Sequence, residues 1–436
     1  MSNITCKFGG TSVADAACLK RVQAIVEDDP NRRFIIVSAP GKRNPDDRKV
    51  TDLLYAWHGL MQQGLDASEP RAIIAGRFEE LAKELGVSFN AYAELEAIAE
   101  EAAAHPEPDY MASRGEHLMA RLVAEFLDAT FVEPADCIRF DDEGALVDDT
   151  YEALAERLGS DARYVIPGFY GASADGSIKT FSRGGSDVTG AVVARASGSA
   201  LYENWTDVPG FLMADPRIVD SPKPIREITY TELRELSYMG AQVLHDEAIF
   251  PVRDPGIPIH IRNTNSPSDP GTLIVPDRTP DQAVCGIAGR RGFTMVTVTK
   301  ALMNKEHGFG RKILSVLEEL GVGFEHMPTG IDTISLIIKD EELGKHGAAV
   351  KKNIERRCDP DDINLTHDLA IIATVGQGMA GHVGLAAELF KALADARVNI
   401  RVIDQGSSEN NIIIGVNSGD LERAVCAIYD ALVDFK

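Results

Sequence analysis

Hydrophobic and polar positions follow two alternating patterns along residues 1–280. Short apolar runs of strand length, such as 4–8, 33–38 and 164–167, are separated by longer stretches with the spacing of amphipathic helices, such as 50–62 and 111–126. Strands that alternate with helices predict an α/β domain, in which helices cover both faces of a mostly parallel sheet. Further strands are predicted at 130–132, 200–203 and 258–261, and further helices at 13–27, 71–85, 92–103, 151–158, 187–197 and 231–239.

The pattern changes after about residue 281, beyond a predicted loop at 263–280 that is rich in Asn, Ser, Pro, Asp and Gly. Val322 aligns with Val398 and Gly330 with Gly406, with a separation of 76 residues in both cases. This constant offset predicts two copies of one small α+β module. Each copy has the order strand, helix, strand, strand, helix, at 295–300, 311–320, 322–327, 333–338 and 343–355, and again at 369–375, 382–394, 398–403, 412–416 and 421–433.

One motif in the second copy matches the dinucleotide-binding fingerprint. Gly376, Gly378 and Gly381 form GxGxxG after a predicted strand, and Asp404 lies about 20 residues further on, where the fingerprint has its acidic residue. The elements that follow are too few to complete a doubly wound sheet. We therefore expect these glycines to serve a tight turn or a small effector.

The most informative local signal lies at the start of the chain. Lys7 and Phe8 end a predicted strand, Gly9 and Gly10 follow, and a helix is predicted next. Glycines allow a backbone to approach a ligand closely, and a helix start offers unpaired N–H groups, so this turn could hold a phosphate. An ordinary strand–turn–helix corner is the alternative.

A second glycine-rich turn, Arg183-Gly184-Gly185-Ser186-Asp187, also precedes a predicted helix. Arg183 could bind a carboxylate or phosphate through two hydrogen bonds, and Asp187 could hold an amine or orient a lysine. The alternatives are a surface ion pair for Arg183 and a helix cap for Asp187.

Three further segments carry polar residues at the ends of predicted elements. Thr206 and Asp207 follow a strand and could contact a nucleotide, with Arg217 nearby in sequence, although a turn around a buried Trp205 explains them equally well. Glu116 could pair with an ammonium group, whereas a helical Glu is more often only solvated. The hydroxyls that could meet a carboxylate, or simply cap helices, are Ser38 and Thr51.

Composition narrows the class of protein. The 436 residues carry a net charge of −23, which argues against nucleic-acid and anionic membrane partners. Six scattered cysteines without a CxxC pair favour a reducing cytoplasm over a disulfide framework or a zinc site. Neither a signal peptide nor an apolar run of membrane-spanning length is present. No Walker A, HExxH or GxSxG motif occurs. No metal site is predicted.

Taken together, these segments resemble the aspartate kinase family over essentially the whole chain. The resemblance rests on KFGGTS at 7–12, FSRGGSDVTGA at 181–191, NWTDVPGF at 204–211, ADPR at 214–217 and ELSYMGAQVLHDEAIFPV at 235–252. The segments MNKEHGFGRKIL and HMPTGIDTISLII are similar to the lysine- or threonine-sensitive bacterial members. The resemblance implies a three-layer αβα amino-acid-kinase domain at 1–280 and two ferredoxin-like ACT modules at 281–365 and 366–436, with the strand near 283–292 pairing with the second module.

The family's reaction transfers a phosphoryl group from MgATP to the β-carboxylate of L-aspartate, and the resemblance implies a role for each motif. Lys7 and Asp187 would be catalytic, with Lys7, Phe8, Gly9 and Gly10 at the phosphates. Thr206, Asp207 and Arg217 would bind the nucleotide. Substrate contacts would come from Ser38, Thr51, Glu116, Arg183, Gly184 and Ser186. Mg²⁺ would be held largely by ATP oxygens.

Two residues depart from the family pattern. Leu212 stands where many members have tyrosine, and Gln242 where many have a nucleotide-contacting lysine.

The ACT pair implies inhibition by lysine, threonine or both, in a homodimer or homotetramer assembled through the ACT modules. The candidate effector contacts are Met303, Phe309, Gly310, Asp332 and Thr333, for which helix-start and hairpin roles are the alternative.

Two other functions stay open at this point. The chain could be a related amino-acid kinase that acts on glutamate or acetylglutamate. It could also be an inactive sensor that uses the ACT pair only to bind an amino acid.

Overall fold

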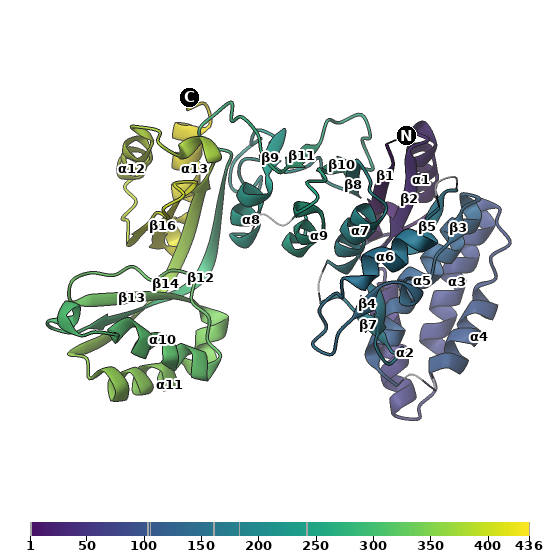
Figure 1. The fold of residues 1–436 in the computed structure, drawn as a ribbon, viewed down its shortest axis with the longest axis horizontal. Coiled ribbons are helices and arrows are strands. Elements are labelled where there is room, and N and C mark those ends of the chain that lie inside the picture. Colours follow the sequence, from purple (N-terminus) through teal and green to yellow (C-terminus); the bar gives the residue numbers. More distant parts are fainter. Residues whose placement is uncertain are drawn as a thin grey trace. The chain divides into compact units, whose positions relative to one another are not determined.

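The computed structural model describes residues 2–102, 104, 106–159, 162–182, 184–240 and 243–435, without the side chain of Asp246. Its contacts divide the chain into two units. The first consists of Met1–Phe211, Arg226–Tyr230 and Gln242–Arg278, and the second of Leu212–Ile225, Thr231–Ala241 and Thr279–Lys436. The residues just before and after 226–230 therefore belong to the unit that also contains the C-terminal modules (Figure 1).

The first unit is built on an eight-stranded sheet with the order β3-β5-β2-β1-β8-β10-β11-β9. Every neighbouring pair is parallel except β10 and β11, which are antiparallel. The strands are β1 (Ile4–Phe8), β2 (Arg32–Val37), β3 (Thr130–Phe131), β5 (Tyr164–Pro167), β8 (Leu201–Thr206), β9 (Glu227–Thr229), β10 (Ile259–Asn263) and β11 (Thr272–Val275). A small sheet of β4 (Arg139–Phe140), β6 (Tyr170–Ser173) and β7 (Ile178–Thr180) accompanies it.

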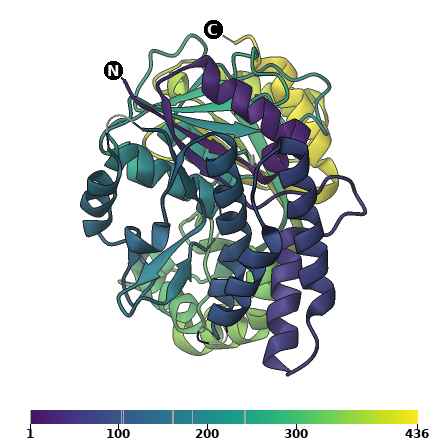
Figure 2. The same cartoon turned by 90° about the vertical axis from the view of Figure 1, so that its right-hand side faces the viewer.

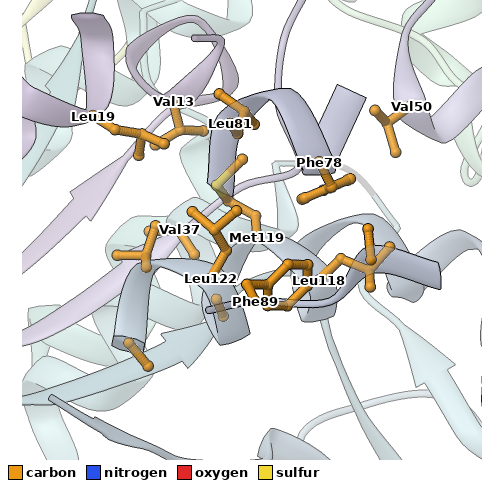
Figure 3. Packing of buried hydrophobic residues seen from close by; sticks show 14 of the residues in the cluster. Val13, Leu19, Val37, Val50, Phe78, Leu81, Phe89, Leu118, Met119 and Leu122 are labelled. Atoms are coloured by element: carbon orange, nitrogen blue, oxygen red, sulfur yellow. The ribbon is translucent and has the colours of Figure 1, made fainter. Parts of the chain in front are cut away.

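Helices cover both faces of the large sheet, as the alternating pattern predicts. One group contains α1 (Ala16–Asp28), α2 (Val50–Gln62), α3 (Ser68–Leu85), α4 (Ala91–Ala102) and α5 (Pro108–Phe126), which gather on one side (Figure 2). Their apolar faces form a core with the strand side chains, where Leu19, Val37, Phe78 and Met119 are fully buried (Figure 3). The opposite face carries α7 (Gly185–Ala196), flanked by α6 (Asp149–Arg157) and α9 (Phe250–Arg253).

The second unit contains a five-stranded sheet with the order β13-β12-β14-β16-β15. Its strands are β12 (Gly286–Thr299), β13 (Thr333–Lys339), β14 (Asp362–Val375), β15 (Val402–Asp404) and β16 (Asn411–Asn417), and its helices α8 (Tyr230–Tyr238), α10 (Phe309–Leu320), α11 (Asp340–Cys358), α12 (Leu385–Asp395) and α13 (Leu421–Leu432). The first half of β12 pairs with the second half of β14, from Gly286 opposite Val375 to Arg291 opposite Ala370. The strand predicted near 283–292 therefore pairs with the second copy, and it is continuous with the strand predicted at 295–300, since both belong to β12.

Most predicted elements lie within a few residues of the observed ones, and α2 matches at both ends. The helix predicted at 13–27 begins only at Ala16, because the Asp15 carboxylate accepts the Cys18 N–H (2.8 Å) and caps it there. The loop predicted at 263–280 contains β11.

The strand predicted at 322–327 is wrong, since this stretch makes only isolated bridges such as His326 with Ile337. The Gly323 N–H donates to the Glu342 carboxylate (2.7 Å) instead of to a strand. Its counterpart at 398–403 shortens to β15.

Two of the three glycines at 376–381, Gly376 and Gly378, allow a close approach of two backbones. A Cβ on Gly378 would lie 2.6 Å from the Gln282 carbonyl oxygen, and one on Gly376 would overlap the Ala283 carbonyl. The motif does not open a helix directly, because α12 begins only at Leu385. Tight packing within the second unit thus explains Gly376 and Gly378, and a left-handed backbone conformation (φ 70°) explains Gly381, without a dinucleotide. Among the described residues, no helix is long and apolar enough to cross a membrane.

Candidate active site

Lys7 and Asp187 form an ion pair across the face of the sheet that carries α7. Lys7 lies near the end of β1, and its Nζ is 2.6 Å from Asp187 Oδ1. Asp187 lies in the first turn of α7, where the helix dipole stabilises a negative charge. Both side chains are largely buried, with exposed fractions of 11% and 13%. The structure thus brings together the two predicted catalytic residues, 180 positions apart in the sequence.

Strand β8 supplies two further contacts to Asp187. Asn204 Nδ2 donates to Asp187 Oδ1 (2.8 Å), and the Tyr202 hydroxyl donates to the Asp187 main-chain oxygen (3.0 Å). Sequence reasoning missed both residues. The available signal was strand alternation, since residues 202 and 204 share one face of a strand and Lys7 sits opposite Asn204 in the β1–β8 register.

The turn after β1 is fixed by its neighbours. The Gly9 N–H donates to the Trp205 carbonyl (3.0 Å), so this N–H is engaged within the protein rather than offered to a phosphate. The Gly41 N–H donates to the Gly10 carbonyl (2.8 Å), and a Cβ on Gly10 would lie 2.8 Å from the Ala39 oxygen. Glycine is required at position 10 because the turn after β1 packs closely against residues 39–41.

The substrate candidates Ser38 and Glu116 both adjoin Ala39, Ser38 in the sequence and Glu116 through a hydrogen bond with the Ala39 backbone. The Ser38 N–H donates to the Phe8 carbonyl (3.2 Å), which places Ser38 beside the end of β1. Glu116 comes from α5, whose Gly115 packs directly against Ala39. Thr51, half-buried, lies in the first turn of α2, and α2 packs on α5.

Glu116 has the unusual environment of a buried carboxyl group. Burial raises its pKa to about 7, although the backbone of Ala39 acts in the opposite direction. Its Oε2 atom is buried and has no hydrogen-bond partner among the described residues. A buried oxygen of this kind costs free energy unless a ligand group pairs with it. Glu116 is therefore suited to receive an ammonium group.

The turn before α7 is shaped by tight packing. Gly184 adopts a left-handed conformation (φ 59°), and a Cβ there would overlap the His245 side chain. Ser186 is buried against Gly168, where a Cβ would lie 2.5 Å from the Ser186 hydroxyl. Arg183 and Gln242 lie outside the described residues.

The predicted nucleotide residues fall into both units. Thr206 ends β8, and its hydroxyl donates to Asp207 (3.3 Å) at a partly exposed edge of the sheet. The Thr206 carbonyl accepts the Thr264 N–H (2.8 Å), which ties the end of β8 to the chain after β10. Arg217 belongs to the second unit, where its exposed guanidinium pairs with Asp215 (2.6 Å).

The candidate effector residues lie on adjoining segments of the second unit. Thr333 begins β13 opposite Thr299, and the Lys300 N–H donates to the Asp332 carbonyl (2.9 Å). Gly310 lies in the first turn of α10. The side chains of Met303 and Phe309 are buried in the local core, which supports a packing role for these two.

Comparison with known proteins identifies the family. The amino acid kinase family profile matches residues 4–263, and an ACT domain profile matches residues 372–432. The chain belongs to the amino acid kinase family. It is 39% identical to aspartokinase 3 of Bacillus subtilis, with 97% of each chain covered, and 27% identical to lysine-sensitive aspartokinase 3 of Escherichia coli over 99% of each.

Solved structures agree with this family assignment. The crystal structure of Clostridium acetobutylicum aspartate kinase matches with a TM-score of 0.90 and 48% identity, covering 99% of this chain and all of that one. E. coli aspartokinase III in complex with aspartate and ADP matches with a TM-score of 0.79 and 26% identity over the same shares of the two chains. The αβα kinase fold with C-terminal ACT-like regions, expected from the sequence motifs, is confirmed.

Proposed function

We propose that this chain transfers the γ-phosphoryl group of ATP to the β-carboxylate of L-aspartate, producing 4-phospho-L-aspartate and ADP. The observation that carries the proposal is the Lys7–Asp187 ion pair (2.6 Å) near the end of β1. Beside Ala39, which follows β2, the buried Glu116 carboxyl oxygen without a hydrogen-bond partner among the described residues supports it. Near full-length similarity to named aspartokinases supports aspartate as the acceptor.

The reaction needs charge neutralisation more than proton transfer. A carboxylate with a pKa of about 4 is already ionised at pH 7, so no base has to activate the nucleophile. The difficulty is to bring two anions together, and phosphoryl transfer is accelerated mainly by positioning and electrostatics. Lys7 would stabilise charge on the transferring group, and Asp187 would hold the Lys7 ammonium in place.

Substrate recognition divides between two ends of aspartate. Glu116 would bind the α-ammonium group, while the hydroxyls of Ser38 and Thr51 and the Arg183 guanidinium would bind carboxylate oxygens. Ionised Glu116 then has a positive partner in the complex, which offsets the cost of burying its charge. An acceptor without the ammonium group would leave Glu116 unpaired.

Nucleotide binding would use Thr206, Asp207 and Arg217 together with the turn at Phe8–Gly10. Mg²⁺ would travel with ATP and neutralise phosphate charge, held mainly by phosphate oxygens. In the part of the chain that the structure describes, no group of three His, Cys, Asp or Glu side chains is arranged to hold a metal.

A coupled ADP-release assay with aspartate, glutamate and acetylglutamate tests the proposal, with Lys7→Ala as the strongly impaired control. We expect release that depends on aspartate and is far weaker with the other acceptors. Preference for glutamate would assign the chain to a related kinase. Amino-acid binding without any ADP release would make it a sensor.

We also propose feedback inhibition through the ACT-like unit, with lysine or threonine as effector. A lysine complex of E. coli aspartokinase III, at 25% identity and a TM-score of 0.76, supports lysine as the first candidate. Inhibition curves with lysine, threonine and both amino acids would identify the effector. Sedimentation with and without effector would decide between a homodimer and a homotetramer.

A further inference from the structure

We propose that Asn204 is a positioning residue for phosphoryl transfer, which acts by fixing the Asp187 carboxylate against Lys7. The inference rests on the proposed function, because it assigns Asn204 a part in the same reaction. Asn204 would act through Asp187, because its side-chain amide donates to that carboxylate (2.8 Å).

Three side chains contact Asp187: Lys7 and Asn204 reach one oxygen of its carboxylate, and Tyr202 reaches its main-chain oxygen. Asp187 Oδ1 receives Lys7 Nζ at 2.6 Å and Asn204 Nδ2 at 2.8 Å. The same Asn204 amide lies 3.3 Å from the Tyr202 hydroxyl, which itself donates to the Asp187 main chain. Asp187 is therefore held both through its carboxylate and through its main-chain oxygen.

Strand β8 explains why Asn204 can do this. Lys7 and Asn204 are directly opposite in the parallel β1–β8 register, and both side chains point to the α7 face. Asn204 is only 1% exposed, so its amide cannot exchange Asp187 for water without a cost. The adjacent residues of β8 face the other way, where Glu203 and Trp205 pack with Arg32.

An apolar residue could fill the Asn204 position and would be the simpler choice for a buried strand. An amide at a fully buried site needs partners, and here it donates to the carboxylate that pairs with Lys7. Without that donor, the first turn of α7 still forms, but one constraint on the Asp187 rotamer is lost. Lys7 would then sample positions away from the transferring phosphoryl group.

The test uses Asn204→Leu, which preserves side-chain size and removes the donor, and Asn204→Asp, which preserves shape and places a like charge beside Asp187. Loss of a hydrogen bond to a charged group predicts a fall in kcat of about 10- to 100-fold for Asn204→Leu. We expect KM for aspartate to stay within about threefold, because the contact acts in the transition state. Asn204→Asp should lose at least as much kcat.

A double-mutant cycle separates positioning from a purely structural effect. If Asn204 acts through the Lys7–Asp187 pair, Asn204→Leu should change the residual kcat of Lys7→Ala by less than about threefold. Tyr202→Phe is the matched control on the same strand face, since it removes a hydroxyl but leaves the Asn204 amide on Asp187. Its kcat should fall less than that of Asn204→Leu.

Three outcomes would overturn the inference. The first is kcat within threefold of wild type for both Asn204 variants, and the second is the same fold-loss in the wild-type and Lys7→Ala backgrounds. The third is a rise in KM for aspartate that accounts for the whole loss. If instead the wild-type protein shows no aspartate-dependent ADP release, the proposed function itself fails, and the inference fails with it.

Discussion

Aspartate binding should release a proton from Glu116, and the amount released should depend on pH in a defined way. Burial raises the pKa of this carboxyl to about 7 in the free protein. Contact with the aspartate ammonium group would favour the ionised form and lower that pKa again. With a free-protein pKa of about 7, about 0.9 proton should leave on binding at pH 6, about 0.5 at pH 7 and about 0.1 at pH 8.

The raised pKa of Glu116 also makes the stability of the first unit depend on pH. Because the folded-state pKa of Glu116 is raised above the ordinary 4.5, the ionised group destabilises the first unit above pH 7. A change from 4.5 to about 7 corresponds to about 3 kcal/mol at 1.36 kcal/mol per pH unit. Glu116→Gln should therefore raise the free energy of unfolding by up to about that amount at pH 8, and the gain should vanish as the pH falls toward 4.5.

Isothermal titration calorimetry in two buffers with different ionisation enthalpies measures the released protons directly. Glu116→Gln is the control, since it should release essentially none while binding aspartate more weakly. Proton release that stays near zero at pH 6 and pH 7 in the wild-type protein would refute the reasoning. So would equal release by wild type and Glu116→Gln, which would locate the titrating group elsewhere.

Two further predictions concern the charge pairs on either side of the sheet. Lys7→Ala should lower kcat by orders of magnitude while KM for aspartate changes less than about threefold, and a kcat within threefold of wild type would contradict its role. Glu203 is buried between Arg32 (2.8 Å) and Arg262 (3.4 Å), so Glu203→Gln should lower the unfolding free energy by about 3 kcal/mol in urea denaturation. Burial raises the pKa of Glu203, but the Arg32 contacts outweigh burial and lower that pKa. The stabilisation by Glu203 should therefore be lost on acidification below about pH 4.5. A urea midpoint unchanged by Glu203→Gln would contradict this prediction.

Periodicity predicted much of the first unit because most of its strands are buried on both faces and its helices are amphipathic. The apolar run at 33–38 and the helical spacing at 50–62 correspond closely to β2 and α2. The turn at Gly9 was predicted to approach a phosphate, but its N–H donates to the Trp205 carbonyl. The turn at Gly184 was predicted to offer free N–H groups at a helix start, and its glycine is required because a Cβ would overlap the His245 side chain.

What the sequence could not supply were contacts between elements that are distant in the chain. The bond from Asn204 to Asp187 depends on the order of β1 and β8 and on their register, which no local pattern encodes. The failed strand at 322–327 has a similar cause, because a side chain from α11, Glu342, takes the Gly323 N–H. The engagement of the Gly9 N–H by Trp205 likewise follows only from tertiary packing.

Trapping of the reaction product with hydroxylamine tests the central claim most directly. An acyl phosphate on the β-carboxylate reacts with hydroxylamine to give aspartate β-hydroxamate, which mass spectrometry identifies. We predict one β-hydroxamate for each ADP released, and formation of both products slowed by orders of magnitude in Lys7→Ala. Release of ADP without hydroxamate, or hydroxamate formed on glutamate in preference to aspartate, would contradict the proposed function.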